Sequence, residues 1–143
     1  MTVLPRLSRL LLAVYTVVVL LITWLPAEDA GRVTGIVDTL AGLLVPLGVP
    51  FDAAYTVLEF LANVALFAPF GALLALAWSR LPWWAASLIG AGLSCVIELV
   101  QIALPSRFAT VSDVVANTLG TLIGVILVRI LQRMRAAART AER

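Results

Sequence analysis

Residues 10–25 read LLLAVYTVVVLLITWL, an uncharged apolar run that decides the fold class. As an α-helix this run reaches about 24 Å, and its extension back to residue 7 brings it close to the thickness of a bilayer core. Arg6 and Arg9 precede it as in a signal peptide, but Leu25, Pro26 and Ala27 do not form the small-residue pattern of a cleavage site. We therefore predict an uncleaved first membrane span over residues 7–25.

The composition of the whole chain agrees with a membrane protein. Of 143 residues, 62% are hydrophobic and 13% are charged, against about 45–50% and 25% in soluble domains. The ten basic residues, all arginine, exceed the eight acidic ones by only two, which is too few for nucleic-acid binding, so we expect no nucleic-acid partner. The chain has no histidine and one cysteine, Cys95. We therefore expect no histidine or cysteine metal centre, no cofactor and no intrachain disulfide. The oxygens of Asp and Glu would still suit a divalent ion such as Mg²⁺ or Ca²⁺.

Three further apolar segments are long enough to cross a bilayer, at residues 56–78, 83–104 and 111–131. The four tryptophans fall at the ends of spans, where indole rings prefer the headgroup level: Trp24, Trp78, Trp83 and Trp84. We predict one all-α membrane domain over residues 1–143, a four-transmembrane-helix bundle with a basic tail at residues 132–143. A bundle this small exposes much surface, so homo-oligomers are also expected.

The segment between the first two spans has apolar residues at helical spacing over residues 36–47, interrupted by Pro46 and followed by Pro50. It is short for a crossing, so we predict an additional interfacial or re-entrant helix. The alternative is a fifth span, which would place the two arginine-bearing termini on opposite sides of the membrane.

Arginine positions predict the orientation, because positive charges near span ends stay in the cytoplasm. With four spans, eight arginines share one side: Arg6, Arg9, Arg80, Arg129, Arg133, Arg135, Arg139 and Arg143. We expect a multi-pass plasma-membrane protein with both termini in the cytoplasm.

Polar side chains in or beside the last three spans need an explanation, because a carboxylate at the bilayer centre costs about 2.5–3.5 kcal/mol. They are Glu59, Asn63, Glu98, Gln101, Asp113 and Asn117. In the predicted orientation all six lie at the outer ends of their helices, and the loop after the third span adds Arg107. We predict that they converge on an outward-facing polar pocket that binds a ligand.

Purely structural roles for the same residues stay open. Thr110 and Asp113 have the spacing of a helix capping box. The amides of Asn63, Gln101 and Asn117 would also serve as hydrogen bonds between helices. Small residues continue inward from the polar positions, among them Gly120 and Gly124, and predict close helix packing. Pro69 and Gly71 predict a kink in the second span.

The residues from about 58 to 127 resemble the VanZ-like family of small bacterial membrane proteins, named for a factor linked to teicoplanin resistance. The resemblance rests on three ordered motifs: Asn63, Phe67, Pro69 and Gly71 as N-x-x-x-F-x-P-x-G; Glu98 and Gln101 as E-x-x-Q; and Asp113, Asn117, Thr118, Gly120 and Gly124 as D-x-x-x-N-T-x-G-x-x-x-G. Many members carry another acid shortly before the position of Asp113, where this chain has Ala109, Thr110, Val111 and Ser112. Glu59 lies outside the motifs.

The resemblance implies a role in the cell envelope and in glycopeptide tolerance. Three acids and one arginine give the predicted pocket a net charge of 1 − 3 = −2, which favours a cation or an amine. We expect a non-catalytic factor that binds a cell-wall precursor, a lipid headgroup or a glycopeptide. A proton- or ion-coupled carrier, a lipid-modifying enzyme and a purely structural bundle are the alternatives, and no hydrolase or nucleotide-binding motif decides whether the protein is an enzyme.

Overall fold

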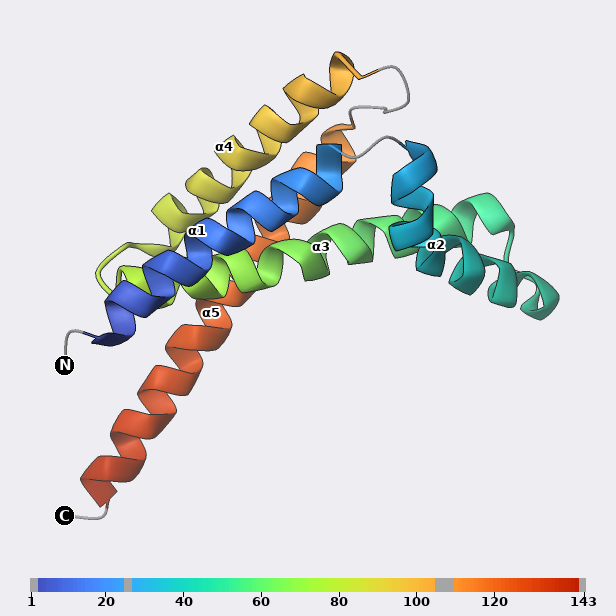
Figure 1. The fold of residues 1–143 in the computed structure, drawn as a ribbon. Helices are drawn as coiled ribbons and strands as arrows, with labels where there is room; N and C mark the ends of the chain where they lie inside the picture. The colour runs from blue at the N-terminus through green and yellow to red at the C-terminus, as the bar shows by residue number, and fades with distance from the viewer. Residues whose placement is uncertain (1–2, 25–26, 105–109, 142–143) are drawn as a thin grey trace.

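The computed structural model describes residues 3–24, 27–104 and 110–141, and all regular structure in that part of the chain is helical (Figure 1). The elements in chain order are α1 (Val3–Trp24), α2 (Ala27–Leu44), the 3₁₀ turn η1 (Val45–Leu47), α3 (Phe51–Ala77), α4 (Trp83–Ile102) and α5 (Val111–Ala141). Helices α1, α3, α4 and α5 are each long and apolar enough to cross a membrane. The predicted all-α four-span fold is confirmed.

The predicted short helix between the first two spans is also confirmed. Its apolar part, Gly35–Leu47, is shorter than a crossing requires, so the alternative of a fifth span is not supported. Figure 1 shows α2 beside the first half of α3, away from the start of α1. Gly48, at φ 86°, turns the chain from η1 into α3, a left-handed backbone conformation that favours glycine.

Helices α3 and α5 form the most extensive contact in the molecule, and glycines bring their backbones together. A Cβ atom on Gly71 of α3 would overlap the backbone of Thr121. From the other side, a Cβ atom on Gly124 of α5 would overlap the backbone of Ala68, and one on Gly120 would overlap the carbonyl of Val64. The small-residue pattern thus accounts for a crossing in which no side chain separates the two helices.

Helix α1 packs on α3 next to Pro69, which lies inside α3 and cannot donate a backbone hydrogen bond. The helix continues on both sides of the proline. In the preceding turn, the carbonyl of Leu66 accepts a hydrogen bond of 2.7 Å from the Tyr15 hydroxyl of α1. The carbonyl that loses its helical donor to the proline is that of Ala65, one residue earlier, so the bond from Tyr15 serves to join α1 to α3 in the turn before Pro69.

One end of the bundle carries arginines from three parts of the chain. The Arg9 guanidinium of α1 lies 5.3 Å from the ring centroid of Trp78, at the end of α3. Arg129 of α5 donates a hydrogen bond to the carbonyl of Leu81 in the α3–α4 connection, which also holds Arg80. We call this the arginine end, and α5 continues beyond it to Ala141.

Candidate binding site

The opposite end of the bundle, which we call the polar end, contains a cavity of about 310 Å³. All five α-helices contribute to its walls. Four of the residues singled out in the sequence line it: Glu59, Asn63, Gln101 and Asp113. The tertiary structure therefore brings polar side chains from α3, α4 and α5 to one place, although 54 residues separate the first from the last along the chain.

A hydrogen bond between side chains joins α3 to α5 at the cavity wall. The Asn63 Nδ2 atom donates to the Asp113 Oδ1 atom at 2.7 Å. Both side chains are partly buried, and a hydrogen bond to a carboxylate is stronger than one between neutral groups. The pair joins the two helices at this end of the bundle.

Gln101 links α4 to α1 in the same region. Its side chain is 8% exposed, and its Nε2 atom donates to the carbonyl of Thr23 at 3.1 Å. Its buried Oε1 atom accepts no hydrogen bond from the described residues. A buried acceptor without a donor costs about 1–3 kcal/mol, so this amide is a place where a donor from water or a ligand would stabilise the protein.

Glu98 does not line the cavity. Its carboxylate, on a side chain only 8% exposed, accepts a hydrogen bond of 2.7 Å from the backbone N–H of Thr110, just before α5. The Thr110 hydroxyl in turn accepts the backbone N–H of Asp113 at 3.1 Å, as the capping-box spacing predicts. Glu98 therefore occupies the place that Asp113 would take in a reciprocal capping box, and the Asp113 carboxylate is turned toward Asn63.

Asn117 lies deeper in the bundle, among buried side chains. It is 4% exposed, and its Nδ2 atom donates to the Ser94 Oγ atom of α4 at 2.8 Å. Its backbone carbonyl accepts the Thr121 hydroxyl at 2.9 Å. Asn117 thus joins α4 to α5 below the cavity, as expected for a hydrogen bond between helices.

The remaining predicted residues have different positions. The Glu59 side chain is exposed at the cavity wall. Arg107 lies outside the described residues. Phe67 is fully buried in the core, with its ring centroid 5.8 Å from that of Phe70. Pro69 is an exposed residue of α3.

The sequence did not single out the other six cavity residues, Ile22, Thr23, Val37, Tyr55, Ala62 and Leu66. Tyr55 could have been found, because it lies four positions before Glu59 and so shares its helix face. Thr23 gives no comparable signal, because it contributes a backbone carbonyl to Gln101. Val37 belongs to α2. The apolar face of this segment predicted that it packs against other helices, but it did not indicate which residues it would lie beside.

The VanZ/LLP1 family model matches residues 12–132, most of the chain. This protein belongs to the VanZ-like family. No curated protein and no solved structure matches the chain significantly. In this VanZ-like protein the three sequence motifs meet in space: Asn63, Gln101 and Asp113 line one cavity, and the glycines of the first and third motifs pack α3 against α5. Its four apolar helices and its family identify a multi-pass membrane protein.

Proposed function

We propose that this VanZ-like protein is a non-catalytic envelope factor that binds a ligand in the polar-end cavity and so contributes to teicoplanin tolerance. The observation that carries the proposal is the convergence of five helices on one cavity with two carboxylates in its walls, those of Glu59 and Asp113. Charged groups in spans are costly, and packing alone does not require two acids in the wall of one cavity.

The chemistry of the walls favours a ligand that donates hydrogen bonds. The described lining contains two carboxylates, the carbonyl end of Gln101 and no arginine. Acceptors that carry negative charge in a site of low dielectric constant attract an ammonium group or a set of amide and hydroxyl donors. Such groups occur on cell-wall precursors, on some lipid headgroups and on glycopeptides, and the family relationship points to these molecules.

The arginine distribution supports a cavity that faces the outer side of the membrane. Arg9, Arg80 and Arg129 share the opposite end of the bundle, and positively charged ends stay in the cytoplasm. An outward cavity is accessible to extracellular glycopeptides and to precursors on the outer leaflet, so the orientation is part of the proposal.

Teicoplanin sensitivity of cells that express the protein at matched levels tests the proposal. We expect the wild type to raise the minimum inhibitory concentration over an empty vector. We expect Glu59→Gln and Asp113→Asn to lower it toward the vector value, since each removes one charge and keeps an acceptor oxygen. The matched control is Asp52→Asn, an exposed acid in the first turn of α3 outside the cavity lining.

Two results would contradict the proposal. One is unchanged tolerance in both cavity variants at equal expression. The other is a pH-dependent flux in proteoliposomes that disappears in Asp113→Asn, which would identify a carrier instead.

A further inference from the structure

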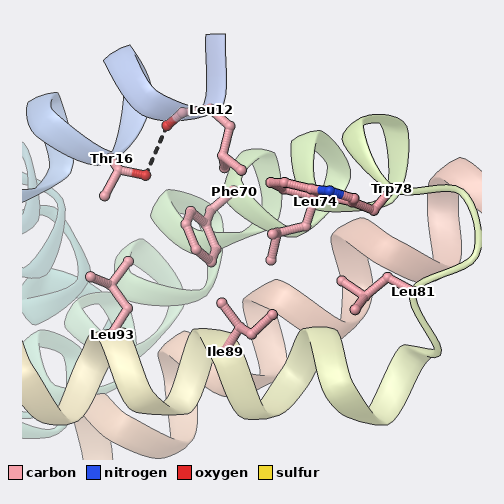
Figure 2. Close-up of a pocket in the computed structure, with 8 residues that line it drawn as sticks. All are labelled: Leu12, Thr16, Phe70, Leu74, Trp78, Leu81, Ile89 and Leu93. Atoms are coloured by element: carbon pink, nitrogen blue, oxygen red, sulfur yellow. Dashed lines mark hydrogen bonds between the residues drawn. The ribbon is translucent and has the colours of Figure 1, made fainter. Parts of the chain in front are cut away.

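A second hollow lies at the arginine end, between α1, α3 and α4, with a volume of about 460 Å³. Ligand pockets typically occupy about 300–1,000 Å³. Figure 2 shows Phe70 and Leu74 of α3 facing Ile89 and Leu93 of α4 across this groove. Thr16, in its wall, uses its hydroxyl to donate to the Leu12 carbonyl at 2.8 Å. The groove therefore presents an apolar lining.

The groove ends beside positive charge. Trp78 and Leu81 line both the groove and a neighbouring hollow of about 350 Å³, whose walls also include Arg9 and Arg80. The contact between the Arg9 guanidinium and the Trp78 ring, at 5.3 Å, positions one cation at this junction. An apolar slot and a basic mouth are thus continuous.

A third hollow, of about 490 Å³, extends the basic surface from Arg80 to Arg129 and Arg133. The sequence contains no aspartate or glutamate in residues 1–27, 60–97 or 114–141, from which α1, the α3–α4 connection and the described end of α5 are built. The chain therefore supplies no carboxylate to these arginines from the elements that surround them. An anion from outside the protein could therefore serve as the counter-ion of this described basic surface.

We propose that the arginine end is a binding site for one anionic phospholipid. One acyl chain occupies the groove between α1 and α4, and the phosphate lies against Arg9 and Arg80. An anionic lipid accounts for both the apolar groove and the arginines beside it. A free phosphate would leave the apolar groove empty, and a lipid without net charge would leave the arginines without a counter-ion. The proposal does not depend on the function of the polar-end cavity.

Native mass spectrometry of the detergent-solubilised protein, with phosphatidylglycerol or phosphatidylcholine of identical acyl chains, tests this site. We expect the wild type to retain one phosphatidylglycerol and to prefer it over phosphatidylcholine. In the double variant Arg9→Gln with Arg80→Gln, phosphatidylglycerol affinity should fall roughly 25-fold, since each arginine contributes about fivefold. The matched control is the double variant Arg135→Gln with Arg139→Gln, which removes the same charge from the exposed end of α5. This variant should retain the lipid.

A second variant tests the groove itself. Ile89 is 44% exposed in the groove wall, so Ile89→Trp should fold, narrow the slot and weaken phosphatidylglycerol binding. Free glycerol 3-phosphate at millimolar concentration should not displace the lipid. Equal binding of the two lipids, an equal loss in the α5 control, displacement by glycerol 3-phosphate, or full binding by Ile89→Trp would each overturn the proposal.

Discussion

Glu98 of α4 holds the start of α5: its carboxylate accepts the backbone N–H of Thr110 at 2.7 Å across the connection between the two helices. The first N–H groups of a helix have no partner inside it and need one elsewhere. Because Thr110 is tied to Glu98, its hydroxyl can accept from the N–H of Asp113, and the Asp113 side chain remains available to Asn63. Glu98 is thus a positioning residue for the cavity.

The hydrogen bond from Thr110 to Glu98 predicts that two substitutions of Glu98 lower the free energy of unfolding by different amounts. Glu98→Ala leaves the Thr110 N–H without its acceptor and should lower the free energy of unfolding by about 1–3 kcal/mol. Glu98→Gln retains an acceptor oxygen and should lose less than half of that. Thermal unfolding in detergent measures both, and equal losses in the two variants would contradict a positioning role.

The contact between Asn63 and Asp113 can be tested by exchanging the two residues. Asn63→Asp places two carboxylates within hydrogen-bond distance and should lower the melting temperature. Adding Asp113→Asn to that variant restores an amide opposite a carboxylate and should recover much of the loss, with a coupling of about 0.5–3 kcal/mol. A double-mutant cycle on unfolding in detergent gives this coupling, and additive losses would show that the two side chains do not interact.

The glycines of the α3–α5 crossing should tolerate no side chain. Gly124→Ala puts a Cβ atom against the backbone of Ala68 and should cost about 1–3 kcal/mol. Gly92→Ala is the control, because its Cβ atom would meet nothing within 4 Å and alanine favours the helix by up to about 1 kcal/mol. Melting temperatures should therefore move in opposite directions, and a neutral Gly124→Ala would contradict the close crossing.

The hydrogen bond from Tyr15 to the Leu66 carbonyl should contribute measurably to stability. Tyr15→Phe removes it and should cost about 0.5–1.5 kcal/mol. Thr16→Val removes a hydroxyl from the same helix, but that hydroxyl bonds to the Leu12 carbonyl one turn earlier, so a smaller effect is expected. Chemical or thermal unfolding in detergent compares the two, and a larger loss in Thr16→Val would refute the assignment.

The orientation of the bundle is testable by labelling in a Cys95→Ala background. Val49→Cys marks the chain beside the polar end, and Ser79→Cys marks the arginine end. A membrane-impermeant maleimide should label Val49→Cys in intact cells, and should label Ser79→Cys only after permeabilisation. The reverse pattern would place the cavity in the cytoplasm and remove its access to extracellular glycopeptides.

Much of the fold follows from the sequence. The length and apolar composition of four segments decide that they are membrane helices, because only a helix satisfies its own backbone in lipid. The prolines and the short apolar stretch before α3 indicate that Gly35–Leu47 is too short to cross. The alternating direction of the spans, together with the position of each polar residue along its span, allowed Asn63, Gln101 and Asp113 to be assigned to one polar end.

The tertiary structure decided which of these polar groups meet. Periodicity fixes side chains relative to their own helix, but it does not fix how far each helix rotates against its neighbours. For that reason the sequence could not distinguish Asp113, which lines the cavity, from Glu98, which turns to the Thr110 N–H. It could not pair Gln101 with the carbonyl of Thr23 either, since a backbone group carries no residue signature. For α3 and α5, the glycine contacts bring the two backbones so close that they restrict the rotation of these helices against each other.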